Sequence, residues 1–115
     1  MDTRTKIVTV AEAARIAASG AATVSGYFDP LTAAHLERLE QLKRPGTPLL
    51  VLITDPLNPV LPWRARAELV AALAVVDYVT EAADGIAAQV RLEPQHDRQF
   101  DELIEHVHAR QSAAT

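Results

Sequence analysis

The most constraining feature of this chain is residues 23–42, TVSGYFDPLTAAHLERLEQL, where an apolar segment breaks at Gly26 and continues as a helix. The helix is expected over about residues 32–43. A strand that turns directly into a helix brings backbone N–H groups and the positive end of the helix dipole to one place. His35, in what we expect to be an exposed first turn, is predicted to face the same place. The stretch therefore predicts a phosphate-binding turn at the end of a strand.

A second apolar run, residues 49–54, shows no alternation, which is typical of a strand covered on both faces in a parallel sheet. The first strand is expected at residues 22–25, and the helix between the two makes a right-handed crossover unit. A further helix over about residues 62–74 and a third strand at residues 75–80 continue the alternation. The pattern predicts an α/β fold, a small parallel sheet with helices on both faces.

Both ends of the chain also carry regular patterns. Thr9 is expected to cap a short helix that covers one edge of the sheet, because Thr9 and Glu12 have a capping-box spacing and Gly20 supplies a stop. Alternation at residues 90–93 predicts an edge strand. Asp97 is expected to open a final helix that ends in a frayed tail. Without an internal repeat or linker, residues 1–115 are predicted to form one domain.

Composition narrows the functional classes. The chain has 115 residues, of which 49% are hydrophobic and 23% charged, as expected for a globular protein. Its net charge of −4 argues against a nucleic-acid surface, which needs clustered Lys and Arg. There is no cysteine, no signal-peptide pattern and no apolar run near the ~20 residues of a membrane span. We therefore expect a cytoplasmic protein that binds neither nucleic acid nor membrane.

Two ordered motifs resemble a known family. The spacing Gly26-x-Phe28-Asp29-x-x-Thr32-x-Ala34-His35 resembles the G-x-F-D-x-x-H-x-G-H signature of the cytidylyltransferase-like nucleotidyltransferases. Residues 59–79, PVLPWRARAELVAALAVVDYV, resemble the segment that follows the second strand in those enzymes. The likeness covers about residues 5–80 and is closest to the nucleotidyltransferase domain of bacterial heptose-phosphate adenylyltransferases and to glycerol-3-phosphate cytidylyltransferases; residues 88–110 diverge. It implies a small Rossmann-like three-layer α/β/α fold with a mainly parallel sheet.

The resemblance also implies a reaction, the transfer of a CMP or AMP moiety from CTP or ATP to a phosphorylated small molecule with release of pyrophosphate. His35 and Thr32 match the catalytic positions that donate to the triphosphate. The residues matching nucleotide-binding positions are Gly26, Tyr27, Phe28, Asp29 and Arg66. Mg²⁺ is expected to arrive with the nucleotide, without a protein-bound metal site. A homodimer is expected, because an open sheet with alanine-rich helices leaves surface for a symmetric partner.

Three positions depart from the family pattern or have a second explanation. Thr32 stands where most members have a histidine; its hydroxyl can donate to a phosphate, cap the helix, or do both at different times. Ala34 replaces the motif glycine, and its methyl group is a steric objection to a bound nucleotide. Arg66 matches the family's basic residue better than Arg64 does, although an arginine on a solvated helix face is the alternative.

Two absences keep the function open. The family often has a lysine after the second strand, but the lysines here are Lys6 and Lys43. Nothing after Val79 resembles the family's late Ser/Thr-rich turn, which holds the triphosphate. The chain is thus either a small nucleotidyltransferase or a catalytically inactive, shortened relative that acts as a nucleotide- or phosphate-binding module or an assembly subunit. His106 and His108 point to different helix faces, so a metal site there is not expected.

Overall fold

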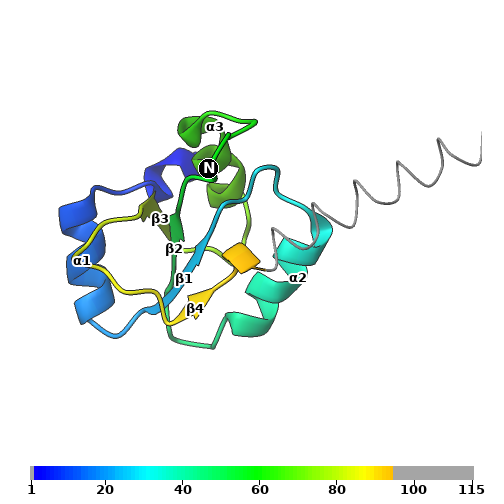
Figure 1. Ribbon diagram of the computed structural model, residues 1–115. Helices are drawn as coiled ribbons and strands as arrows, with labels where there is room; N and C mark the ends of the chain where they lie inside the picture. The colour runs from blue at the N-terminus through cyan, green and yellow to red at the C-terminus, as the bar shows by residue number, and fades with distance from the viewer. Residues whose placement is uncertain (1, 95–115) are drawn as a thin grey trace, which may run out of the picture.

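The computed structural model describes residues 2–94, which fold around one parallel sheet (Figure 1). Its strands are β1 (Ala22–Gly26), β2 (Leu49–Ile53), β3 (Tyr78–Glu81) and β4 (Val90–Arg91). They lie in the order β3-β2-β1-β4 and every pairing is parallel. The predicted α/β class with a parallel sheet is confirmed.

The strand order reverses at β1. The chain moves from β1 to β2 on one side and later returns to place β4 on the other side. In an open parallel sheet, such a reversal leaves a crevice at the carboxyl ends of the two strands that flank it. Here these strands are β1 and β4, so a ligand site is expected at the residues that follow them.

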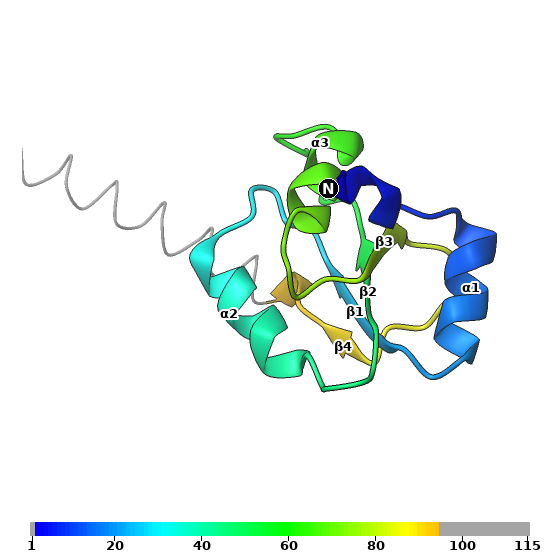
Figure 2. The same ribbon diagram turned by 180° about the vertical axis from the view of Figure 1, so that it is seen from behind.

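Helices cover both faces of the sheet (Figures 1 and 2). On one face, α2 (Ala33–Leu42) and α3 (Trp63–Ala71) contribute Leu39 and Val70 to a core with Val51 of β2. On the other face, α1 (Val10–Ala18) and residues 82–89 pack on Leu50 and its neighbours. All five residues of β2 are buried, which explains its unbroken apolar sequence.

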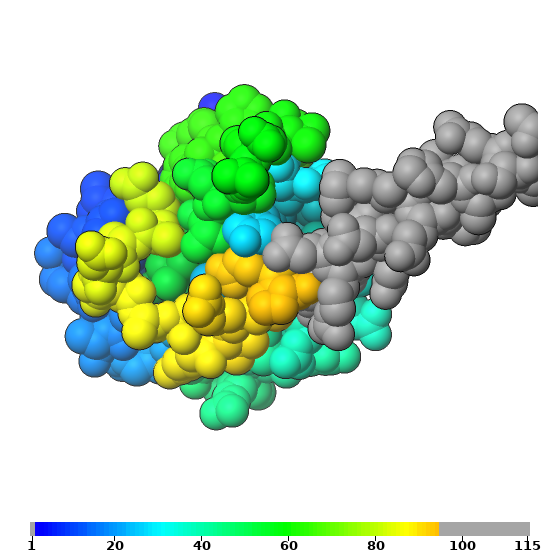
Figure 3. Space-filling model, viewed as in Figure 1, coloured from blue at the N-terminus to red at the C-terminus, as the bar shows by residue number. Residues whose placement is uncertain are grey.

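The first helix forms as predicted and packs near the border of the sheet that β3 forms. Thr9 caps α1 by accepting a hydrogen bond from Glu12 N, and Gly20 follows with a positive φ of 102°. Ala13 of α1 packs with Leu50 and Leu52 of β2, and the helix also contacts β3, so it covers one face of the sheet at the border that β3 forms. Figure 3 shows the segment after β3, in yellow, on the surface beside α1.

The third strand begins later than predicted, at Tyr78, and α3 ends earlier, at Ala71. Lys6 Nζ explains part of this difference, because it donates to the carbonyl oxygens of Leu73 (3.0 Å) and Val76 (2.8 Å) and holds the connection in a turn. A 3-10 helix, Thr3–Lys6, precedes α1 and was not predicted. β4 is two residues shorter than expected.

Beyond the sheet, the final helix expected from Asp97, the tail, and His106 and His108 lie outside the described residues. None of the helices formed by residues 2–94 is long and apolar enough to cross a membrane.

Candidate functional site

The first turn of α2 is closed by a reciprocal pair of hydrogen bonds. Thr32 Oγ1 accepts from His35 N at 3.4 Å, while His35 Nδ1 accepts from Thr32 N at 3.1 Å. This is a capping box in which histidine takes the position usually held by Glu or Gln. The capping role of Thr32 is confirmed, and its contact with a phosphate stays a prediction. Thr32 and Ala34 are both exposed in this turn.

His35 is buried, with 3% of its surface exposed, so its side chain does not share the exposure of the first turn in which it was expected. The ring packs edge-on against Phe28, with 5.7 Å between ring centroids and 87° between planes. Phe28 reaches this place through a positive φ of 49°, which turns its side chain into the core under α2. Because Nδ1 accepts a hydrogen bond, a neutral His35 ring carries its hydrogen on Nε2.

Asp29 connects two loops at the carboxyl ends of the strands. Its Oδ2 accepts from Val60 N at 2.6 Å and its Oδ1 from Leu61 N at 2.7 Å. These bonds hold the proline-rich loop after β2 against the turn after β1. The carboxylate that the motif assigns to nucleotide binding therefore has a structural task in the described part of the chain.

Arg66 is the second residue that connects the loops at this end of the sheet. It is 1% exposed, so the alternative of a solvated helix face is wrong. Its Nη1 donates to Tyr27 O (3.1 Å) and Thr54 O (2.8 Å), which follow β1 and β2. Nε donates to Leu61 O at 3.1 Å, and Nη2 donates to Asp55 Oδ1 at 2.6 Å. These hydrogen bonds take up four of the five N–H groups of the guanidinium.

Gly26 completes the junction, since its carbonyl oxygen accepts from Thr54 N at 3.0 Å. The structure thus brings all the predicted site residues to one region beyond β1 and β2. It arranges several of them to hold the loops together: the carbonyl of Tyr27, the carboxylate of Asp29 and the guanidinium of Arg66.

Sequence reasoning missed Glu93. Its carboxylate accepts hydrogen bonds from Ser25 Oγ and Thr54 Oγ1, both at 3.0 Å, and the residue is 6% exposed. It lies at the crevice between β1 and β4, because Leu92 N beside it donates to Ser25 O at 2.8 Å. The alternation at residues 90–93 predicted an edge strand and gave Glu93 no role at a site. The available signal was a hydroxyl residue, Ser25 or Thr54, at the end of each of two apolar strands.

Acidic residues dominate the carboxyl ends of the strands. Each strand has one as its last residue or within three residues after it: Asp29, Asp55, Glu81 and Glu93. Arg91 ends β4, and Arg64 and Arg66 lie near the start of α3, where Arg64 pairs with Glu68 and Arg66 pairs with Asp55. With all groups at their ordinary charge, this edge of the described structure is net negative, unlike a surface that attracts a triphosphate.

The geometry therefore combines an exposed, capped helix N-terminus with a buried carboxylate beside it. Residues 2–94 contain no group of three His, Asp or Glu side chains that could hold a metal ion. No protein-family model and no curated protein matches this chain.

Proposed function

We propose that this chain is a catalytically inactive relative of the cytidylyltransferase-like nucleotidyltransferases, and that it binds a single phosphate group at the start of α2. The motif resemblance, the parallel sheet and the exposed first turn of α2 support a phosphate site. The observation that carries the loss of turnover is Arg66, the basic residue of the second motif, which is buried and bonded to backbone carbonyls.

Nucleotidyl transfer needs several donors to neutralise the charge that develops on the triphosphate. Residues 82–94, which follow β3 and include β4, contain neither Ser, Thr nor Lys. No lysine follows β2 either. In the described part of the chain, the donors left for a ligand are chiefly those at the first turn of α2, which suits one phosphate better than three.

Glu93 adds an electrostatic argument. Its carboxylate lies between the carboxyl ends of β1 and β4, at the same edge of the sheet as the first turn of α2, and like charges repel strongly where little water separates them. A triphosphate carries more negative charge than a phosphomonoester, so the carboxylate of Glu93 repels it more strongly. The proposal is therefore a preference for CMP or glycerol 3-phosphate over CTP or ATP.

The test is a calorimetric titration with CMP, glycerol 3-phosphate, CTP and ATP, together with an assay for pyrophosphate release. We expect the monoesters to bind more tightly than the triphosphates, and no pyrophosphate when CTP or ATP is mixed with glycerol 3-phosphate or a sugar 1-phosphate. Turnover in the parent protein would sink the proposed inactivity. Tighter binding of triphosphate without turnover would contradict the single-phosphate site.

A matched pair of variants locates the site. Ala34→Asp places a carboxylate in the exposed first turn of α2, where it stabilises the helix by about 0.3–1 kcal/mol but repels a phosphate. Ala11→Asp makes the same change in the exposed first turn of α1. We expect both to raise stability and only Ala34→Asp to remove phosphate binding. Equal affinity in both variants would place the phosphate elsewhere.

A second candidate function, an assembly subunit, is favoured by one observation. Leu57 and Val60 are 91% and 72% exposed, yet they belong to the loop that Asp29 and Arg66 hold in place. Apolar side chains held outward by a fixed loop are typical of a protein contact. Size measurements on the parent protein and loop variants test this role without any ligand.

A further inference from the structure

A pocket of about 210 Å³ lies at the amino ends of β1 and β4, at the opposite edge of the sheet from the candidate site. It is bounded by the start of these two strands and by the turn that follows α2. None of its lining residues takes part in the phosphate site proposed above, so it would serve a separate ligand.

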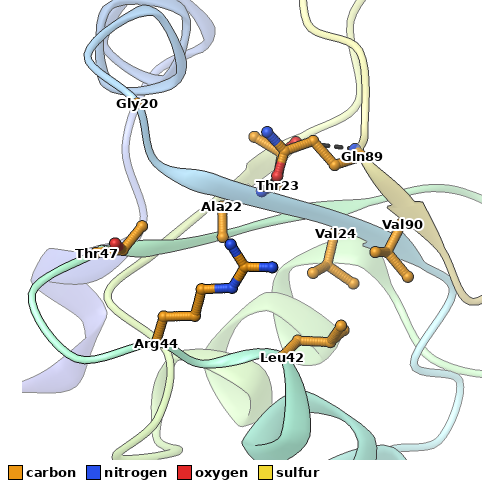
Figure 4. A pocket seen from close by; sticks show the side chains of 9 residues that line it. All are labelled: Gly20, Ala22, Thr23, Val24, Leu42, Arg44, Thr47, Gln89 and Val90. Atoms are coloured by element: carbon orange, nitrogen blue, oxygen red, sulfur yellow. Dashed lines mark hydrogen bonds between the residues drawn. The ribbon is translucent and has the colours of Figure 1, made fainter.

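The pocket has mixed walls, in which polar surface exceeds apolar surface. Ala22 and Val24 of β1 and Val90 of β4 direct their side chains toward Leu42 and Arg44, which come from the other side (Figure 4). Val24 is almost completely buried and forms part of the floor. These side chains can contact a small apolar part of a ligand, while Thr23, Thr47 and Gln89 add polar groups to the lining.

Arg44 supplies the charge. It is the one lining residue with a formal charge, and its guanidinium extends into the pocket in Figure 4. No residue within 2–94 forms a side-chain hydrogen bond or ion pair with it, whereas Arg4, Arg64 and Arg66 each pair with a carboxylate. Its backbone is fixed by a hydrogen bond from Thr47 N to Arg44 O at 3.2 Å.

We propose that this pocket binds a small, compact monocarboxylate. The planar guanidinium of Arg44 matches a carboxylate through two parallel hydrogen bonds, and the rest of a compact molecule contacts the mixed lining of the pocket. The volume fits this class, because a cavity of about 150 Å³ holds a benzene molecule. A benzene-sized ring with one carboxylate therefore fits in about 210 Å³.

The first test compares benzoate with benzamide, which has nearly the same shape but no charge. In a titration followed by amide NMR signals, we expect benzoate to shift the signals of Val24, Gln89 and Val90 saturably. Benzamide should bind at least about tenfold more weakly, the scale of a charge-assisted hydrogen bond. Equal affinities, or benzoate shifts that lie away from these residues, would overturn the proposal.

The second test is Arg44→Met, which removes the charge and keeps the length of the side chain. Arg44 is exposed, so the fold should be unchanged, and a preserved pattern of amide signals checks this. We expect benzoate affinity to fall about ten- to hundredfold. Arg64→Met, on the exposed surface of α3, is the matched control and should leave benzoate affinity as in the parent. Unchanged affinity in Arg44→Met would exclude the guanidinium as the anchor.

Discussion

Arg66 shows how much a single buried cation can determine at the ends of two strands. Its guanidinium donates to the carbonyl oxygens of Tyr27, Thr54 and Leu61, three residues that lie outside the strands and α3. Burying a charge is favourable only when most of its donors are used. The ends of β1 and β2 and the loop between β2 and α3 are consequently held as one unit.

The first prediction follows from this arrangement. Arg66→Met should lower the free energy of unfolding by about 3 kcal/mol or more, because three partly buried carbonyl groups lose the donor that a buried guanidinium supplies. Urea denaturation monitored by circular dichroism measures it. Arg64→Met, which removes an exposed ion pair with Glu68, should change stability by no more than about 0.5 kcal/mol. Similar effects of the two substitutions would contradict a structural role for Arg66.

Glu93 is the residue that sets the charge of the crevice. Glu93→Gln keeps its shape and can still bond the hydroxyl groups of Ser25 and Thr54, which donate or accept. We expect the affinity for CTP and ATP to rise, with the affinity for CMP changing less. Calorimetric titration of both variants measures the ratio. A ratio identical to that of the parent would mean that Glu93 does not select against triphosphates.

At the scale of elements, α2 depends on its first turn. Thr32→Ala removes the acceptor for His35 N and should lower the free energy of unfolding by about 1 kcal/mol, whereas Thr32→Ser should preserve it. Thr9→Ala at the start of α1 provides a comparison, since Thr9 Oγ1 accepts from Glu12 N at 3.2 Å. Thermal or urea unfolding measures all three. A Thr32→Ala variant as stable as the parent would show that the box contributes nothing.

The elements that the sequence predicted well are those that local signals define. β2 is an unbroken apolar run because both of its faces are covered, and α1 and α2 begin at hydroxyl residues that cap them. The start of β3 could not be read locally, because the turn before it is held by Lys6, which is far away in the sequence. The placements of Arg66 and Glu93 likewise depend on partners from other strands.

The carboxyl end of α2 is attached to the sheet through an acid-sensitive contact. Asp77 Oδ2 accepts from Lys43 Nζ and from Leu49 N, both at 2.7 Å. Partial burial alone would raise the pKa of Asp77, but these hydrogen bonds and the charges of Lys43 and Lys6 together hold that pKa below its usual 3.8.

A lowered folded-state pKa gives the direction of the effect. The contact stabilises the fold above pH 3.8, the unfolded value, and is lost as the pH falls through the lower folded value. We therefore expect the stability difference between the parent and Asp77→Asn to be constant near neutral pH and to shrink in this acid range. Urea denaturation at a series of pH values measures it. A difference that does not change with pH would contradict the contribution of the carboxylate charge.

At the scale of the whole molecule, we expect the exposed side chains of Leu57 and Val60 to form a contact between two copies of this chain. Leu57 and Val60 stand on a loop with little freedom to bury them within their own chain. We expect a dimer at tens of micromolar, measured by light scattering, and a monomer for the double variant Leu57→Ser with Val60→Ser. Leu69→Ser, which changes a half-exposed leucine on α3, is the control and should remain dimeric. A parent protein with the monomer mass would remove this prediction.

The pairing of residues 7–8 with β3 affects how readily the border of the sheet can bind a strand from another chain. Ile7 bridges to Val79 in parallel, Val8 N donates to Val79 O at 2.9 Å, and Thr80 Oγ1 donates to Val8 O at 3.0 Å. Residues 7–8 thus pair with the outer side of β3. In the described residues the opposite border is β4, which offers only a two-residue template to an incoming strand. In the described residues, both borders of the sheet therefore expose few unpaired backbone groups, which disfavours pairing with strands of other chains and so disfavours fibril formation.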